Sequence, residues 1–278
     1  MKEVLRKSVL TLGTTLLVCS SALAQDYETL AKRAMDYVMQ DSLVQAEVFF
    51  KKALKLDPKS SKNALIFSNL GSVQKRMGKL DEAIESYSMA LNITPYATSI
   101  LLNRAAAYLD KGNADKAYID YCQVIDLIPG NIEARLFRAY IYMDRRQYKE
   151  ARIDYNAILN NDPEHRAARL GIIMLDQKEN HLLKARNGVD NMIVETPSDF
   201  VLYQIRANIE LDMNMPESAL LDLEEVVRLN GADAETYVMM GDVNLSLKHK
   251  DEARKAYEAA IALGIPREQL RSRLKKCR

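Results

Sequence analysis

The chain has 278 residues, of which 39 are basic and 38 acidic, so its formal net charge is +1. This balance provides no large field of either sign, which argues against a nucleic-acid partner or an anionic membrane surface. After residue 24 no run of about eighteen apolar residues occurs, so we expect no transmembrane segment in the mature protein.

The first 24 residues have the pattern of a secretory signal peptide. A basic start is followed by an apolar stretch over residues 8–18, which is too short to span a bilayer. Ala22 and Ala24 then provide the small residues of a cleavage site before Gln25. We therefore expect an exported protein, periplasmic or secreted. The alternative is a lipoprotein anchored through Cys19. A lipoprotein site requires a small residue before the cysteine, and Val18 at this position is not small.

Residues 27–267 follow a repeat with a period of 34 residues. The clearest marker is an alanine, whose first spacing is 37 residues and whose next five spacings are 34, at Ala46, Ala83, Ala117, Ala151, Ala185, Ala219 and Ala253. A large apolar or aromatic residue stands four residues after each alanine, and a proline stands twelve residues after the first five, at Pro58, Pro95, Pro129, Pro163 and Pro197. A period of this length is typical of stacked helical hairpins.

Each repeat is expected to hold two short antiparallel helices. The alanine lets a neighbouring backbone come close, because a larger side chain there would overpack the contact. The large residue four positions later lies on the same helical face and fills the space between helices. The proline cannot continue the second helix, so it begins the next repeat. Hairpin turns are expected at Gly78, Gly112, Asn180 and Asn214.

Together these positions resemble the tetratricopeptide repeat (TPR), whose first helix carries large–x2–Leu–Gly–x2–Tyr before the alanine, the aromatic residue and the proline. The first-helix pattern is matched best at Phe67, Leu70 and Gly71 and at Tyr237, Met240 and Gly241. The resemblance implies an all-α fold, a right-handed α-solenoid of helix-turn-helix repeats. We expect one domain over residues 25–278, with repeats at 27–60, 64–97, 98–131, 132–165, 166–199, 200–233 and 234–267.

Two segments allow more than one interpretation. Residues 267–278 are expected to form a C-terminal capping helix, because Leu270 and Leu274 share a face and basic residues lie outside it. The alternative is a basic peptide for anionic partners. The fifth repeat departs most from the pattern and has Gly188 inside its second helix. It is either a decayed repeat held by its neighbours or a hinge.

The sequence contains no recognisable catalytic or metal-binding motif. Its three histidines, His165, His181 and His249, fall in turns or repeat junctions, without a second ligand at helical spacing. Cys122 and Cys277 are too far apart in a regular array to form a disulfide, so we expect Cys277 to be an unpaired thiol, with intermolecular pairing as the alternative. We expect no catalysis, no metal and no cofactor.

The resemblance implies that partners bind the concave face, which is formed by first-helix residues that point away from the packed side. We predict that a protein or extended peptide is held there by Phe137, Tyr140, Met143, Met174, Leu102, Leu136, Asn69 and Asn103. The two asparagines match a residue that some family members use to bind C-terminal carboxylates, but the lysines of that site are missing here. We expect a non-catalytic adaptor or scaffold in a bacterial envelope. The alternatives are a self-associating structural subunit of an envelope assembly, and an envelope enzyme.

Overall fold

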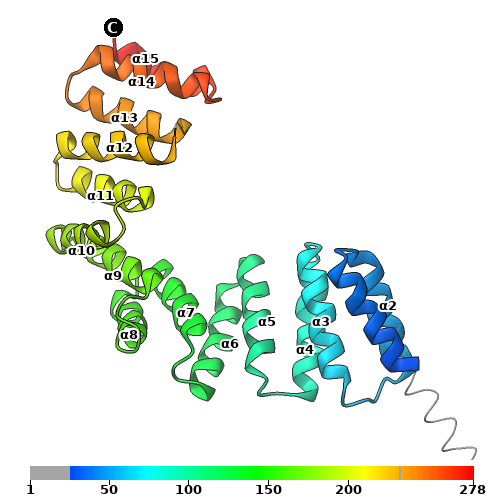
Figure 1. The fold of residues 1–278 in the computed structure, drawn as a ribbon. Helices are drawn as coiled ribbons and strands as arrows, with labels where there is room; N and C mark the ends of the chain where they lie inside the picture. Colours follow the sequence, from blue (N-terminus) through cyan, green and yellow to red (C-terminus); the bar gives the residue numbers. More distant parts are fainter. Residues whose placement is uncertain (1–25, 232) are drawn as a thin grey trace, which may run out of the picture. The chain divides into compact units, whose positions relative to one another are not determined.

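A computed structural model describes residues 26–231 and 233–278, and throughout these ranges its regular structure is helical (Figure 1). The predicted signal peptide, with its cleavage site before Gln25 and the alternative lipid site at Cys19, lies outside the described residues. The predicted all-α fold of paired helices is confirmed.

A helix over residues 26–39 comes first, and the helices after it are short and separated by tight connections. They are α2 (Leu43–Leu56), α3 (Asn63–Arg76), α4 (Leu80–Ile93), α5 (Thr98–Asp110), α6 (Ala114–Leu127), α7 (Ile132–Asp144), α8 (Tyr148–Leu159), α9 (Arg166–Lys178), α10 (Leu182–Glu195), α11 (Phe200–Asp212), α12 (Pro216–Asn230), α13 (Ala234–Ser246), α14 (Lys250–Ala262) and α15 (Arg267–Lys276).

The chain forms two compact units, one ending at Ile141 and the other running from Tyr142 to Arg278. In the first unit, α2 packs on α3, and each helix from α3 to α6 packs on the next. In the second unit, neighbouring helices pack in the same way from α8 to α15. The boundary falls within α7, so the fourth predicted repeat belongs to both units. A single domain over residues 25–278 stays a prediction.

The repeat alanines lie at the closest contacts between helices, and the exposed fraction of all seven is 0%. The tyrosines four residues later are buried too, and three of their rings, those of Tyr87, Tyr155 and Tyr257, lie over a first-helix glycine. A Cβ atom at Gly71 would lie 2.8 Å from the ring of Tyr87, and one at Gly241 would lie 2.3 Å from the ring of Tyr257. Any side chain at these glycines would therefore displace a buried ring.

A residue with positive φ follows each first helix and turns the chain into the second. The predicted turn residues have φ between 58° and 77°, and they are Gly78, Gly112, Asn180 and Asn214. Sequence reasoning missed Asp41, Arg146 and Lys248, which hold the same repeat position with φ between 57° and 65°. Because long side chains adopt this left-handed conformation at a cost, the hairpin geometry imposes it at Arg146 and Lys248.

The C-terminal helix α15 packs on α14 and covers the core of the last hairpin. Leu270 is 1% exposed and joins a cluster with Tyr257 and Ala260. Cys277 is buried in the same cluster as a free thiol, and its Sγ donates a hydrogen bond to the Arg273 carbonyl at 3.4 Å. A buried thiol is poorly placed to pair with another molecule, so the structure favours an unpaired Cys277.

Candidate partner-binding surface

The first unit carries six of the eight predicted partner-binding residues. We call the predicted positions on α3, α5 and α7 the first-helix face; they are Asn69, Leu102, Asn103, Leu136, Phe137 and Tyr140. Tyr140 is 62% and Phe137 40% exposed, and Asn103 is exposed as well. The remaining three side chains are half-buried.

The exposure of Tyr140 follows from helical geometry. Its sequence neighbours, Ala139 and Ile141, are 0% and 1% exposed and form part of the buried stripe of α7. A residue between them projects away from the packed side, because successive helical residues are about 100° apart. Tyr140 therefore presents a large aromatic ring that has no packing role of comparable depth.

Phe137 has a different environment from Tyr140. Its ring stacks on the buried ring of Tyr121 in α6, with centroids 5.5 Å apart and planes at 10°. Leu102 likewise packs against the core of this unit. Both side chains therefore stabilise helix packing while offering only part of their surface to a partner. Of the large residues on the first-helix face, Tyr140 is the most available.

Met143 and Met174 belong to the second unit. Met174, on α9, is 48% exposed and lies between the buried residues Ile173 and Leu175. Met143, near the end of α7, is half-buried. Met174 thus shows in the second unit the same pattern as Tyr140 in the first, a large apolar side chain between two core residues.

Pairs of a partly buried arginine and a buried aspartate link first helices to second helices. In the first unit, Arg104 of α5 donates two hydrogen bonds to Asp120 of α6, both 2.8 Å long, and a third to Ser88. In the second unit, Arg206 of α11 is bonded in the same way to Asp222 and also reaches Asp190 at 2.7 Å. These arginines are bound within the protein and are not available to a partner's carboxylates.

The pKa values agree with a structural role for these arginines. Hydrogen bonds to Asp222 raise the pKa of Arg206, and burial only partly opposes them. The same balance, with Asp120, raises the pKa of Arg104. Sequence reasoning missed both pairs. The signal was available, because Arg104 and Arg206 hold the same repeat position and an aspartate follows each by 16 residues.

One group of side chains near the start of α10 has metal-ligand chemistry. Ligand atoms of Asp176, Glu179 and His181 lie within 4.8 Å of one another. Arg152 already donates to both carboxylates, at 2.7 and 2.5 Å, and Lys184 lies 3.3 Å from Asp176. Two cations therefore balance the negative charge of the cluster, which makes it an ion-pair network between α8, α9 and α10.

A second set of exposed apolar side chains lies on the second helices. Each stands two residues after a repeat alanine, and they are Val48, Ile119, Ile153 and Leu221, between 44% and 67% exposed. Sequence reasoning missed them because it searched the first helices alone. Single exposed aliphatic residues are common on soluble proteins, so this set is a weaker candidate than aromatic Tyr140.

Comparisons with known proteins agree with the repeat pattern. A family model described as "TPR repeat" matches residues 75–112, and one described as "Tetratricopeptide repeat" matches residues 98–131, 132–165 and 234–263. The chain is similar to a tetratricopeptide repeat protein from Parabacteroides merdae, whose crystal structure has a TM-score of 0.76 and 31% identity and matches 91% of this chain and 99% of that chain.

More distant similarities involve the same fold. The structure of YrrB, described as "a TPR protein with an unusual peptide-binding site", has a TM-score of 0.52 and 16% identity over 65% of this chain and 91% of that one. A curated relative, RNA polymerase II-associated protein 3 of Mus musculus, is 32% identical over 92 residues. That match covers 30% of this chain and only 14% of the relative's length. None of the described helices combines the length and the apolar composition that a transmembrane span requires.

Proposed function

The chain belongs to the tetratricopeptide repeat family, and from this premise we propose that it is a non-catalytic adaptor that binds a protein or extended peptide on its first helices. Repeats of this family indicate a protein-interaction scaffold. The sequence has no catalytic motif, and the group with metal-ligand chemistry that the described residues contain, around Asp176, is neutralised by Arg152 and Lys184. YrrB, which shares the fold, is described as having a peptide-binding site.

The exposure of Tyr140 is the observation that carries this proposal. A tyrosine that leaves 62% of its surface in water, between two fully buried neighbours, adds little to the fold. Tyrosine is also among the residues that contribute most to protein interfaces, because its ring supplies a large contact area at a small entropic cost. Half-exposed Met174 extends the same chemistry to the second unit.

The binding test compares Tyr140 with a matched control. Ile119 of α6 is also 62% exposed but lies on a second helix. A partner is first recovered from the native host with the tagged wild-type protein, and its affinity is then measured for each variant. Tyr140→Ala should weaken binding by about 1–3 kcal/mol, or roughly 5- to 150-fold, whereas Ile119→Ala should not. If the two variants bind equally, the partner does not use the first-helix face.

We also propose that the protein is exported, with a mature chain that begins at Gln25. The support is the basic start, the short apolar stretch and the small residues at Ala22 and Ala24. Mass mapping of the N-terminus of protein purified from its own host tests this directly. A mature chain that starts at a lipid-modified Cys19 would replace the soluble form by a membrane-anchored adaptor. An intact N-terminus would refute export through this signal.

A further inference from the structure

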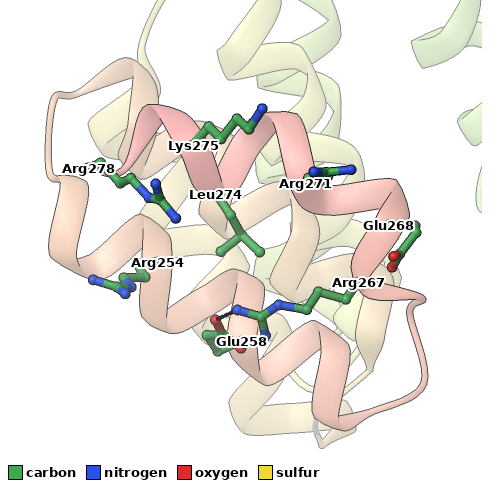
Figure 2. A pocket seen from close by; sticks show the side chains of 8 residues that line it. All are labelled: Arg254, Glu258, Arg267, Glu268, Arg271, Leu274, Lys275 and Arg278. Carbon is green, nitrogen blue, oxygen red and sulfur yellow. Dashed lines mark hydrogen bonds and ion pairs between the residues drawn. The ribbon is translucent and has the colours of Figure 1, made fainter.

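The outer side of the C-terminal helix carries an unusual concentration of positive charge. A cleft of about 410 Å³ between α14 and α15 is lined by eight residues, Arg254, Glu258, Arg267, Glu268, Arg271, Leu274, Lys275 and Arg278 (Figure 2). We call it the terminal cleft. Five of its residues are basic and two are acidic, in a chain whose basic and acidic residues are otherwise almost balanced.

Within the part of the chain that the structure describes, most of the basic side chains in the terminal cleft form no hydrogen bond or ion pair. Arg267 donates to both carboxylate oxygens of Glu258, at 2.8 Å each, and this pair is therefore neutral. The other four basic side chains make no hydrogen bond or ion pair with any described residue; they are Arg254, Arg271, Lys275 and Arg278. Figure 2 shows Leu274 pointing from α15 towards α14 among these charged groups.

The repeat provides a direct comparison for the terminal cleft. A second cleft lies one repeat earlier, and five of its lining residues precede five residues of the terminal cleft by 34 positions. The corresponding pairs are Leu220 and Arg254, Glu224 and Glu258, Tyr237 and Arg271, Met240 and Leu274, and Asn244 and Arg278. The two clefts are thus the same feature in successive repeats.

The earlier cleft shows what such a feature accommodates. Helices α12 and α13 form two of its walls. The third wall is α14, the second helix of the repeat, which contributes Lys255, Ala256 and Ala259. In the terminal cleft, α15 takes the place of α13, and among the described residues no helix takes the place of α14. The shape therefore suits one further helix. The chemistry has changed, however, because Leu220, Tyr237 and Asn244 are replaced by arginines.

Capping the solenoid explains only part of this chemistry. An array end must be polar to stay in water, but residues of either charge, or of no charge, would meet that need. The five basic residues of the cleft outnumber its two acidic residues, Glu258 and Glu268, so the excess positive charges repel one another. An acidic ligand would remove that repulsion, and Leu274 would provide an apolar contact at the same place.

We propose that the terminal cleft binds an acidic helical segment of a partner protein, which takes the position of a further second helix. Carboxylates on one face of that helix lie against Arg254, Arg271, Lys275 and Arg278, and an apolar residue meets Leu274. This surface is separate from the first-helix face, so the inference does not depend on the proposed function.

The test measures binding of a defined probe to the full chain. The probe is a fluorescein-labelled peptide of about 15 residues, similar in length to one second helix, with glutamates and leucines on one helical face. Matched peptides replace every glutamate by glutamine, or introduce a central proline that breaks the helix. Fluorescence anisotropy at low ionic strength gives the dissociation constants, and added salt should weaken binding.

Two protein variants locate the site. Arg271→Gln with Lys275→Gln should weaken binding of the acidic peptide by roughly tenfold or more. Lys276→Gln, which removes a charge from the same helix outside the cleft, should have no such effect, and neither should Tyr140→Ala. All the substituted side chains are exposed, so unchanged circular dichroism is expected.

Several results would overturn the proposal. Equal weakening by Lys276→Gln would show general attraction between charges and no cleft. Equal binding of the proline-containing peptide would exclude a helical ligand. Stronger competition by inorganic phosphate than by sodium chloride at the same ionic strength would indicate a site for small anions. Absence of binding to the wild-type chain at low salt would refute the site altogether.

Discussion

The folded protein should be more stable when the buried tyrosine of the third repeat loses its hydroxyl group. Tyr121 is 0% exposed, and its hydroxyl has no hydrogen-bond partner among the described residues. Burial also raises the pKa of Tyr121, with smaller contributions from nearby carboxylates, so the hydroxyl stays neutral. Tyr121→Phe removes this group while keeping the ring and its stack on Phe137.

Two equivalent tyrosines show why Tyr121 lacks a partner. The hydroxyl of Tyr87 lies 3.1 Å from Ser72 Oγ, and that of Tyr257 donates to Asp242 at 2.8 Å. Ser72 and Asp242 hold one repeat position, and in the third repeat that position is Ala106. Alanine offers no polar atom, so the hydroxyl of the third-repeat tyrosine is buried without compensation.

The expected change in the free energy of unfolding differs in sign among the three tyrosine-to-phenylalanine variants. A buried polar group without a partner costs about 1–3 kcal/mol, so Tyr121→Phe should raise the free energy of unfolding by about 1 kcal/mol once the lost packing of one oxygen is subtracted. Tyr257→Phe should lower it by about 1–2 kcal/mol, because its hydroxyl is bonded to a carboxylate. Tyr87→Phe should fall between them, with a loss of about 0.5–1 kcal/mol.

Urea unfolding followed by far-ultraviolet circular dichroism measures these differences, and unchanged transition slopes make the midpoints comparable. Repeat arrays can unfold in parts, so hydrogen exchange in α5 and α6 localises the effect of Tyr121→Phe. Ala106→Ser should add about 1 kcal/mol in the wild-type background and nothing after Tyr121→Phe. A loss of 1 kcal/mol or more in Tyr121→Phe would show that the hydroxyl is satisfied and would refute this reasoning.

Two further predictions concern pH and turn geometry. Burial acts to raise the pKa of Glu47, but hydrogen bonds from Lys51, Lys79 and Gln74 outweigh it and lower the pKa to about 2 from an ordinary value of 4.5. The stabilisation is therefore present above pH 4.5 and is lost as pH falls towards 2. In urea unfolding, Glu47→Gln should lower the free energy of unfolding by about 2–3 kcal/mol at pH 7 and by almost nothing at pH 2. A loss that does not depend on pH would contradict this. Arg146→Gly should raise stability by about 0.5–1 kcal/mol in the same assay, since Arg146 has φ of 57°, and a loss would mean that its side chain stabilises the turn.

The repeat pattern predicted the packing of this fold well because packing depends on residue size at fixed spacing. The repeat alanines are all fully buried, and prolines such as Pro58 and Pro95 stand two residues beyond the last residue of a second helix. Turn conformation was harder to predict. Residue types such as Gly78 and Asn180 predict a positive φ at their positions. Arg146 has a positive φ only because the helices on either side require it.

The candidate surface was harder to predict than the core. Helical spacing places Phe137 and Tyr140 on exposed parts of α7, but it does not show that the ring of Phe137 stacks on Tyr121 of the preceding helix. Pairs such as Arg104 and Asp120 were missed because charged residues in a helical sequence usually lie in water, although their spacing of 16 residues recurs at Arg206 and Asp222. Tertiary contacts between neighbouring helices decide both cases, and the repeat period alone gives no sign of the ring stack.

The fifth repeat illustrates how a departure from the pattern can be a packing solution. Elsewhere a small first-helix residue such as Gly71 faces a large second-helix residue such as Tyr87. In the fifth repeat, Ile173 stands at the small position, and Gly188 lies against it in α10. A Cβ atom at Gly188 would lie 2.9 Å from Ile173 Cγ1, so this glycine, next to the buried Val189 at the large position, leaves the room that Ile173 needs.

This close contact predicts that the effect of Gly188→Ala depends on Ile173. Alanine favours the helix by about 1 kcal/mol over glycine, but overpacking against Ile173 costs about 1–3 kcal/mol, so the wild-type background should show no gain or a net loss. After Ile173→Ala the clash is gone, and Gly188→Ala should then raise the free energy of unfolding by about 1 kcal/mol. Urea unfolding of the four variants in this cycle measures the coupling. Equal gains in both backgrounds would show that Gly188 is not needed for packing, and would favour its interpretation as a hinge.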